Sequence, residues 1–406
     1  MKTDLTHKQT PTRLTPPGSG HDQLLYFTSP SLTADGRYLV FLSDRTGHPN
    51  IFARDLQTGQ ERQLTDNTEG ILKSYIYFHG TPYRGLGKAS MSLDVERGIV
   101  YYLQGRQICA VTMEGHRRVI AEYPADQMTA YTHISADGTR VCVPSTDARA
   151  LGGDEILPGY PDFNVDDRVR AENLSSYIRV YDTATGEQIV CEEIPRAWVT
   201  HVQFSPTDHH VILYNHEWTV EDRGIRRIWI WDGNGHRCLR TEGGGRSRKD
   251  YVTHEMWERD GKGIVYHGAY ITPTPGYENL EQFVGRVTPD GSTITEIALP
   301  RPWGRYGHFT VGHPGQLVTD GYYEEAEDQP AEKKSATWIN GGTWITYMKV
   351  DWPNQSIEWV PLTRSGSSWN SQDCHPHPIF SHESDGIFFT SDREGNRGVY
   401  RVEVPK

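Results

Sequence analysis

The sequence predicts an all-β fold, a seven-bladed β-propeller whose ring is closed by the N-terminal strand pairing with the last blade. Three observations lead to this prediction: a short motif recurs seven times, similar hairpins separate its copies, and the two chain ends complement each other. The composition agrees, because 40 glycines and 24 prolines among 406 residues imply many turns and short strands.

The recurring motif is clearest near the two ends of the chain. Residues 35–56 read DGRYLVFLSDRTGHPNIFARDL and residues 385–402 read DGIFFTSDREGNRGVYRV, each with a turn, an apolar strand, Ser-Asp-Arg and a second strand. Seven such units of about four strands are typical of a propeller and divide poorly into the sheets of a β-sandwich, the alternative fold. The weaker copies begin near Asp94, Asp137, Asp208, Asp260 and Gly312.

The outer strands predict how the ring closes. Residues 61–65 and 358–363 read as fourth strands, and the last copy ends without such a strand. The segment PTRLT at 11–15 resembles the missing strand, so we expect it to pair with the last blade and remove a free edge. Spacing between copies varies, which places insertions near 70–88, 147–172, 270–283 and 322–343.

The bulk properties predict one domain over residues 1–406, with residues 1–10 as a flexible tail. A formal net charge of −12 argues against nucleic acid and membrane surfaces as partners. Five cysteines without a CxxC motif argue against a disulfide framework. The N-terminus lacks an apolar signal core and no apolar run is long enough to span a membrane, so we expect a cytoplasmic protein.

Histidines recur at one position of four consecutive copies. Each lies three residues before an apolar residue that precedes the Asp-Gly-type turn. Because the first strand of each blade lines the channel of a propeller, we expect these histidines at one height near one channel mouth. His375 lies two residues from one of them and shares its face by strand alternation. The four pairs are His201 with Phe204, His254 with Trp257, His308 with Val311, and His377 with Phe380.

Imidazoles gathered in this way suit a divalent transition metal. His308, His375 and His377 could supply three nitrogens, and Gln372 could add an oxygen. Three or four protein ligands leave positions for a substrate oxygen, which is the arrangement of a catalytic site. Taken singly, each histidine could instead be structural, and Gln372 could be a turn residue.

Four stretches carry a family resemblance: NHEW at 215–218, RIWIWDGNG at 227–235, THEMWERDGKGIVY at 253–266, and HPHPIFSHESDGIFFTSDREG at 375–395. In these stretches the chain resembles the oligogalacturonate lyases, seven-bladed propellers that cleave pectin-derived oligogalacturonides by β-elimination. The resemblance is specific in the last four copies and weak in the first three. The loops at 72–89 and 322–343 depart from the family pattern.

The resemblance also implies a role for each matching residue. His254 is implied as the general base, and Arg227 as a catalytic arginine that binds the substrate, with Arg226 as the alternative. The implied cofactor is a divalent metal, manganese in this family. Its implied ligands are His308, Gln372, His375 and His377.

The predicted function is a metal-dependent lyase that cleaves a small anionic uronide oligosaccharide by β-elimination. The metal would neutralise the uronate carboxylate while a neutral histidine removes the C5 proton. We also expect His201, Arg305 and Tyr306 to contact the substrate. Two alternatives remain open, a non-catalytic propeller that binds proteins and a metal-dependent hydrolase that uses the same histidines. A serine hydrolase is disfavoured because no GxSxG motif occurs.

Overall fold

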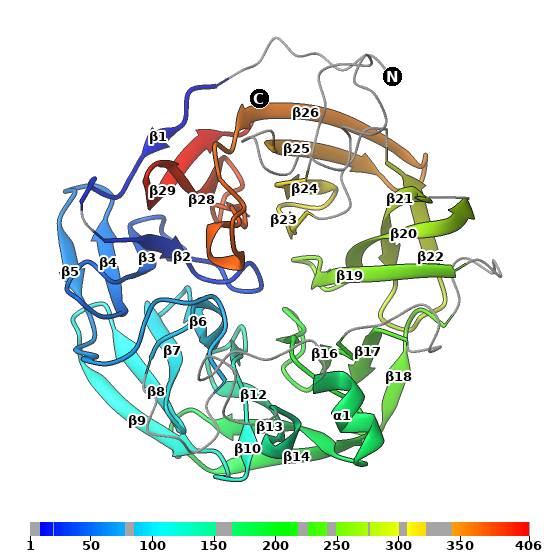
Figure 1. The fold of residues 1–406 in the computed structure, drawn as a ribbon, viewed down its shortest axis with the longest axis horizontal. Coiled ribbons are helices and arrows are strands. Elements are labelled where there is room, and N and C mark those ends of the chain that lie inside the picture. The colour runs from blue at the N-terminus through cyan, green and yellow to red at the C-terminus, as the bar shows by residue number, and fades with distance from the viewer. Residues whose placement is uncertain are drawn as a thin grey trace. The chain divides into compact units, whose positions relative to one another are not determined.

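The structure, a computed structural model, describes residues 9–18, 20–77, 85–151, 165–217, 226–241, 249–274, 277–299, 307–321 and 343–405. Within these residues the strands form seven antiparallel sheets (Figure 1). The chain divides into two compact units. Among the described residues, those from 9 to 23 and from 239 to 405 belong to unit 1, and those from 24 to 217 and from 226 to 238 belong to unit 2.

Four sheets lie in the first part of the chain. Their strand orders are β2 (Asp22–Leu24), β3 (Tyr38–Ser43), β4 (Asn50–Asp55), β5 (Glu61–Gln63); β6 (Met91–Asp94), β7 (Ile99–Gln104), β8 (Gln107–Thr112), β9 (Arg117–Glu122); β10 (Gln127–Met128), β12 (Arg140–Asp147), β13 (Ser175–Asp182), β14 (Gln188–Pro195), with β11 (His133–Ile134) on β12; and β15 (Val202–Phe204), β16 (Ile212–Asn215), β17 (Ile228–Trp231), β18 (His236–Cys238). The helix α1 (Val165–Ala171) and the 3-10 turns η1 (Lys88–Ser90) and η2 (Ala148–Leu151) also belong to this part.

Three sheets follow in unit 1. Their strand orders are β19 (Lys249–Trp257), β20 (Ile264–Thr274), β21 (Tyr277–Val287), β22 (Ile294–Ala298); β23 (Phe309–Val311), β24 (Gln316–Thr319), β25 (Trp344–Asp351), β26 (Ser356–Arg364); and β27 (Ile379–Phe380), β28 (Gly386–Glu394), β29 (Asn396–Glu403), β1 (Thr12–Arg13). A 3-10 turn, η6 (Gln372–Cys374), precedes the last sheet.

The recurring Asp-Gly motif forms the turn between the first two strands of a sheet. In the β10–β14 sheet, Asp137 accepts a hydrogen bond of 2.6 Å from the Ser135 hydroxyl and one of 3.1 Å from the Thr139 amide. Gly138 follows with φ of 68°, a conformation that costs glycine little. A Cβ atom there would lie 2.2 Å from a carboxylate oxygen of Asp94, so the turn requires glycine.

Apolar strand faces pack against neighbouring sheets within each unit. In unit 1, one buried cluster joins the β23–β26 sheet to the last sheet and includes Ile345, Leu362, Phe380 and Phe389. Full burial of one such side chain stabilises the fold by about 1.5–3 kcal/mol. This packing fixes the strand starts of two adjacent sheets, which matters because both carry candidate site residues.

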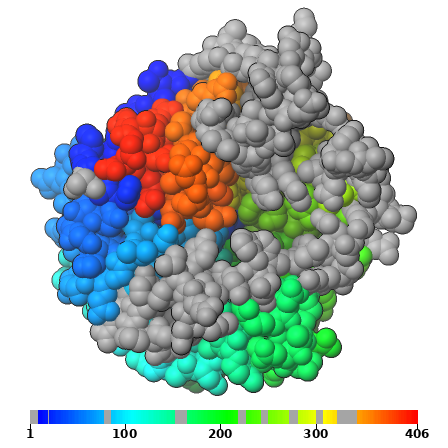
Figure 2. All heavy atoms as spheres, in the orientation of Figure 1, coloured from blue at the N-terminus to red at the C-terminus, as the bar shows by residue number. Residues whose placement is uncertain are grey.

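The N-terminal segment adds a fourth strand to the last sheet. Thr12 pairs with Arg401, and the Leu14 amide donates to the Val399 carbonyl at 2.8 Å. Figure 1 shows β1 beside β29, and Figure 2 shows dark blue atoms against the red C-terminal atoms. The predicted pairing is therefore present, while closure of the ring stays a prediction. The predicted outer strands are also present, as β5 and β26.

Other sequence expectations fare differently. The predicted insertion at 270–283 is a long hairpin, in which β20 and β21 continue to the pair Thr274–Tyr277. Residues 1–8 of the predicted tail lie outside the described residues, whereas the Gln9 amide donates to the Leu362 carbonyl. The five cysteines, all within the described residues, form no disulfide with one another. Among the described residues, no helix has the length and apolar character needed to cross a membrane.

Candidate metal centre and neighbouring groups

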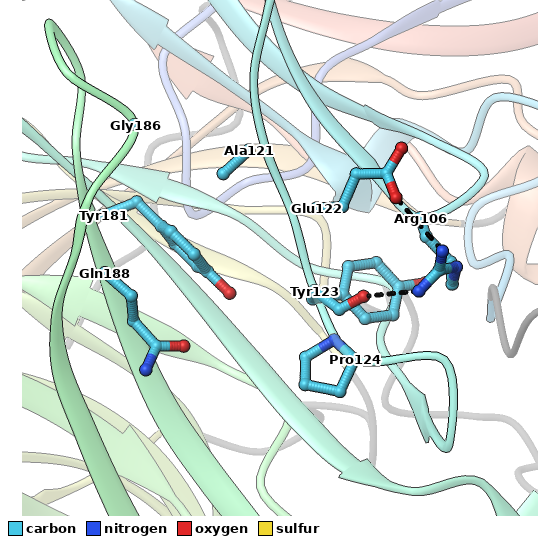
Figure 3. Close-up of a pocket in the computed structure, with 8 residues that line it drawn as sticks. All are labelled: Arg106, Ala121, Glu122, Tyr123, Pro124, Tyr181, Gly186 and Gln188. Carbon is cyan, nitrogen blue, oxygen red and sulfur yellow. Dashed lines mark hydrogen bonds and ion pairs between the residues drawn. The ribbon is translucent and has the colours of Figure 1, made fainter.

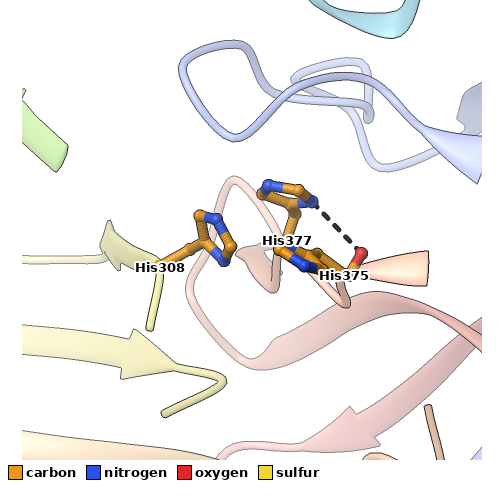
Figure 4. Close-up of side chains that lie close together, drawn as sticks. All are labelled: His308, His375 and His377. Atoms are coloured by element: carbon orange, nitrogen blue, oxygen red, sulfur yellow. Dashed lines mark hydrogen bonds between the residues drawn. The ribbon is translucent and has the colours of Figure 1, made fainter. Parts of the chain in front are cut away.

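Three predicted ligands, His308, His375 and His377, come together in unit 1 (Figure 4). His308 directly precedes β23, and the other two directly precede β27. One nitrogen of each ring lies within 4.8 Å of the others. The His308 and His377 ring centroids are 3.8 Å apart, and both side chains are buried. This spacing brings three imidazole nitrogens to one point, as a metal ion requires.

Hydrogen bonds fix which nitrogen of two rings carries the lone pair. His308 Nδ1 lies 2.9 Å from a carboxylate oxygen of Asp320, and His377 Nδ1 lies 3.1 Å from the His375 carbonyl oxygen. A carboxylate and a carbonyl only accept, so each Nδ1 carries the proton. The lone pair of each ring therefore lies on Nε2, which is the nitrogen that can bind a cation.

Asp320 contacts two of the candidate ligands and is not among the residues predicted from the sequence. It is fully buried, and besides the His308 ring it accepts the backbone amides of His308 at 2.6 Å and His377 at 3.1 Å. One carboxylate thus holds two candidate ligands from different sheets. Hairpin register could have revealed it, because Asp320 and His308 lie one residue beyond the cross-strand pair Phe309–Thr319.

The backbone is strained at this cluster. His377, Trp369 and His254 have positive φ angles of 45°, 56° and 55°. Such conformations cost roughly 1–2 kcal/mol for residues other than glycine, and they concentrate at functional sites. The Trp369 ring lies 4.2 Å from the His375 ring, so it packs beside the candidate ligands.

Gln372, the fourth predicted ligand, opens the 3-10 turn η6. Its Oε1 atom is buried and, within the described part of the chain, has no hydrogen-bond partner. An unpaired buried amide oxygen costs about 1–3 kcal/mol, which coordination to a cation would offset. Imidazole nitrogens with an amide oxygen form a donor set that divalent transition metals accept, so these residues fit the implied metal.

His254, the predicted base, also lies at this cluster. Its ring centroid is 4.6 Å from that of His308, and its Nδ1 lies 2.7 Å from Nε2 of His267. It occupies a bulge in β19, where the register shifts between Thr253 and Met256. A bulge turns a side chain away from the regular alternation, which aims His254 toward its neighbours.

Arg227 and His201 belong to unit 2 and form a separate cluster. The Arg227 side chain is only 3% exposed, and its guanidinium lies 3.1 Å from the Glu217 carboxylate and 3.1 Å from His201 Nδ1. Burial alone would raise the pKa of Glu217, but the Arg227 charge and a hydrogen bond from Thr200 hold it at about 2. The predicted substrate-binding arginine is thus paired within the protein.

His201 has the opposite tautomer from His308. Asn215 Oδ1 accepts the backbone amides of Thr200 and His201, so its amino group faces His201 Nδ1 at 3.2 Å. Arg227 also donates to this Nδ1, which must therefore be the acceptor. The proton then lies on Nε2, 3.4 Å from the Tyr26 hydroxyl, and the two rings stack at 5.7 Å.

Three further predicted residues are Arg226, Arg305 and Tyr306. The Arg226 carbonyl accepts from the Trp229 indole at 2.7 Å, while Arg305 and Tyr306 lie outside the described residues. A pocket of about 550 Å³ in unit 2 contains none of the predicted site residues (Figure 3). Its arginine, Arg106, pairs with Glu122 at its edge.

The chain is similar to known proteins in sequence and in fold. No family model matches the chain. An oligogalacturonate lyase of Dickeya dadantii is 24% identical over 417 residues, which span 97% of this chain and 92% of that protein. An oligogalacturonide lyase of Pectobacterium atrosepticum is 24% identical over 245 residues, which span 56% of this chain and 55% of that protein.

Two solved structures share the fold. A crystal structure of oligogalacturonate lyase from Vibrio parahaemolyticus matches with a TM-score of 0.74 and 21% identity, over 98% of this chain and 94% of that one. An oligogalacturonate lyase in complex with manganese matches with a TM-score of 0.74 and 21% identity, over 100% and 96%. The fold is therefore a seven-bladed β-propeller, and it carries a histidine cluster of metal-binding type. Over most of its length the chain is similar to oligogalacturonate lyases in sequence and in fold.

Proposed function

We propose that this protein is a metal-dependent lyase that cleaves short oligogalacturonides, with Mn²⁺ as its metal. The observation that carries the proposal is the convergence of three imidazoles beside His254, with the lone pairs of His308 and His377 held on Nε2. The names of the relatives and the manganese in one similar structure support the substrate class and the metal.

The metal ligands in this proposal are His308, Gln372, His375 and His377. When bound, a divalent cation would act as a Lewis acid toward the uronate carboxylate, which makes the adjacent C5–H bond more acidic. The protein's part is to fix the ligand atoms in advance. Asp320 does this for His308 through Nδ1, and the His375 carbonyl does it for His377.

His254 acts as the base in this proposal. Its Nδ1 is engaged with His267, so Nε2 is the nitrogen that can take the C5 proton. The electron pair of the broken C5–H bond forms the C4=C5 double bond. The C4–O4 bond breaks, and the leaving oxygen takes up a proton, so the products together have the mass of the substrate.

Arg227, His201, Arg305 and Tyr306 stay proposed substrate contacts. The Arg227 guanidinium is an anion-binding group, and its pairing with Glu217 keeps it oriented. Direct binding of a uronate carboxylate would have to exchange with this ion pair. A role of Arg227 as a fixed positive charge near the substrate needs no such exchange.

The test uses digalacturonate and trigalacturonate with purified protein and added Mn²⁺. We expect ultraviolet absorbance from an unsaturated uronide and product masses that sum to the substrate mass. Product masses that exceed the substrate mass by one water molecule would indicate a hydrolase. If no uronide gives a product when metal is supplied, the lyase proposal is wrong and the alternative of a non-catalytic, protein-binding propeller is favoured. The exposed His313, on the same hairpin as His308, offers a control, because His313→Ala should keep full activity.

A further inference from the structure

In two sheets the histidine of the repeat contacts its cross-strand neighbour. In the β15–β18 sheet the neighbour of His201 is Asn215, and in the β23–β26 sheet the neighbour of His308 is Asp320. Both neighbours contact Nδ1 of their histidine, at 3.2 Å and 2.9 Å. Asn215 donates to that nitrogen and Asp320 accepts from it, so the neighbour selects the tautomer of the histidine.

His267 holds this neighbour position in the β19–β22 sheet. The register pairs His267 with Thr253, and the shift between Thr253 and Met256 leaves the next residue, His254, in the bulge, where its ring contacts His267. His267 Nε2 lies 2.7 Å from His254 Nδ1. The His267 side chain is fully buried, and its ring packs 4.7 Å from Phe309, which restricts its orientation.

We propose that His267 is a positioning residue whose Nε2 accepts the Nδ1 proton of His254 and leaves the lone pair of His254 on Nε2. The inference rests on the proposed role of His254 as the base. Nδ1 of His254 is hydrogen-bonded to His267, so His254 can take up the substrate proton only at Nε2. Nε2 must therefore be unprotonated before the reaction. His267 thus corresponds to Asp320, and both hold the Nδ1–H tautomer of their partners.

The first test compares three substitutions at one position. The glutamine amide oxygen reaches the place of the imidazole Nε2, whereas the shorter asparagine amide reaches only that of Nδ1. We expect His267→Gln to keep most of kcat, and His267→Asn and His267→Leu to lose about 10-fold to 100-fold. KM and bound Mn²⁺ should not change in any variant. Equal losses in the glutamine and asparagine variants would contradict the proposal, because a role in packing alone does not distinguish them.

The second test does not use activity. Nitrogen NMR of the full-length protein, labelled with ¹⁵N-histidine and free of paramagnetic metal, reports which ring nitrogen of His254 is protonated. Comparison with His254→Ala assigns the signals. We expect protonated Nδ1 and bare Nε2 in the wild type and in His267→Gln, and a shift toward the Nε2–H form in His267→Leu. A wild-type protein with the Nε2–H form would overturn the proposal.

The two tests separate the two hypotheses. A wild-type protein with bare Nε2 on His254 that cleaves no uronide would contradict the lyase function and leave the tautomer assignment standing. A wild-type protein that cleaves uronides but carries Nε2–H on His254 would contradict the role of His267 alone.

Discussion

His201 of the β15–β18 sheet and His308 of the β23–β26 sheet each lie directly before the first strand and opposite the end of the second strand. Their surroundings differ. Around His201, Asn215 and Arg227 donate to Nδ1, and Glu217 neutralises the arginine. At His308, Asp320 accepts from Nδ1, and two further imidazoles face the other side of the ring.

This comparison shows that the repeat places a histidine at the same position in both sheets. The cross-strand residue, Asn215 or Asp320, then determines which nitrogen of that histidine carries the proton. In unit 2 the charges of Arg227 and Glu217 compensate each other. In unit 1 the arrangement gathers lone pairs around one point, and the buried Gln372 oxygen has no hydrogen-bond partner among the described residues. Three imidazole nitrogens gathered in this way can hold a divalent cation.

The largest expected effect separates chemistry from metal binding inside unit 1. We expect His254→Ala to lower kcat about 1000-fold, because general bases contribute roughly 10²–10⁴ to rate. The metal content should stay that of the wild type, since the ligand rings are untouched. Turnover on trigalacturonate and metal analysis of the same preparation measure both. Loss of metal together with activity would place His254 among the ligands instead.

The second effect concerns the stability of unit 2. The folded-state pKa of Glu217, about 2, is below its ordinary value of 4.5, so the unfolded chain binds more protons between these values. The ion pair therefore stabilises the fold above about pH 4.5, and this contribution is lost as the pH falls toward 2. We expect Glu217→Gln to lower the free energy of unfolding at pH 7 by on the order of 3 kcal/mol.

Urea denaturation of the wild type and Glu217→Gln, at pH 7 and near the acid limit of folding, measures this effect. The difference between the two proteins should shrink as the pH falls. Mn²⁺ affinity should be the same in both proteins, because Glu217 belongs to the compensated cluster. A large change in the Mn²⁺ affinity of Glu217→Gln would contradict the claim that the Glu217 cluster takes no part in metal binding.

The third effect tests Asp320. Asparagine at this position can donate toward His308 Nδ1, as Asn215 does toward His201, and so would favour the wrong tautomer. We expect Asp320→Asn to weaken Mn²⁺ binding about 10-fold to 100-fold in calorimetric titration. Asp137→Asn is the matched control, because Asp137 pairs with the partly exposed His209 of unit 2 at 2.6 Å. Equal weakening in both variants would count against a specific role of Asp320.

The smallest effect concerns Gln372. We expect Gln372→Leu to weaken Mn²⁺ binding while raising the stability of the metal-free protein by about 1 kcal/mol, because the buried unpaired oxygen is removed. Thermal unfolding with and without Mn²⁺ measures both quantities. A variant with unchanged metal affinity would remove Gln372 from the ligand set and leave the three histidines.

Most of the fold could be predicted from the spacing of the Asp-Gly-type repeats and from their alignment with one another. Alignment of the repeats predicts the seven sheets and the pairing of β1 with β29. Together with strand alternation, it also predicts that His308, His375 and His377 lie close together. The insertion predicted near 270–283 corresponds to the extended β20–β21 hairpin, which lengthens two strands of one sheet.

The sequence did not reveal the groups that act through hydrogen bonds. Asp320 reads as a turn residue after an apolar strand, and His267 reads as one member of an alternating strand. Their roles depend on cross-strand register, on the bulge at His254 and on positive φ angles, none of which a residue pattern specifies. Similarly, the burial of Arg227 against Glu217 depends on packing within unit 2.

The most direct test of the central claim is anomalous diffraction from a crystal of the wild-type protein soaked with Mn²⁺, measured at the manganese absorption edge. We predict one dominant peak bound by Nε2 of His308 and Nε2 of His377, with His375 and the Gln372 amide oxygen completing the protein ligands. No peak at this cluster at saturating Mn²⁺, or coordination through Nδ1 of His308, would contradict the account.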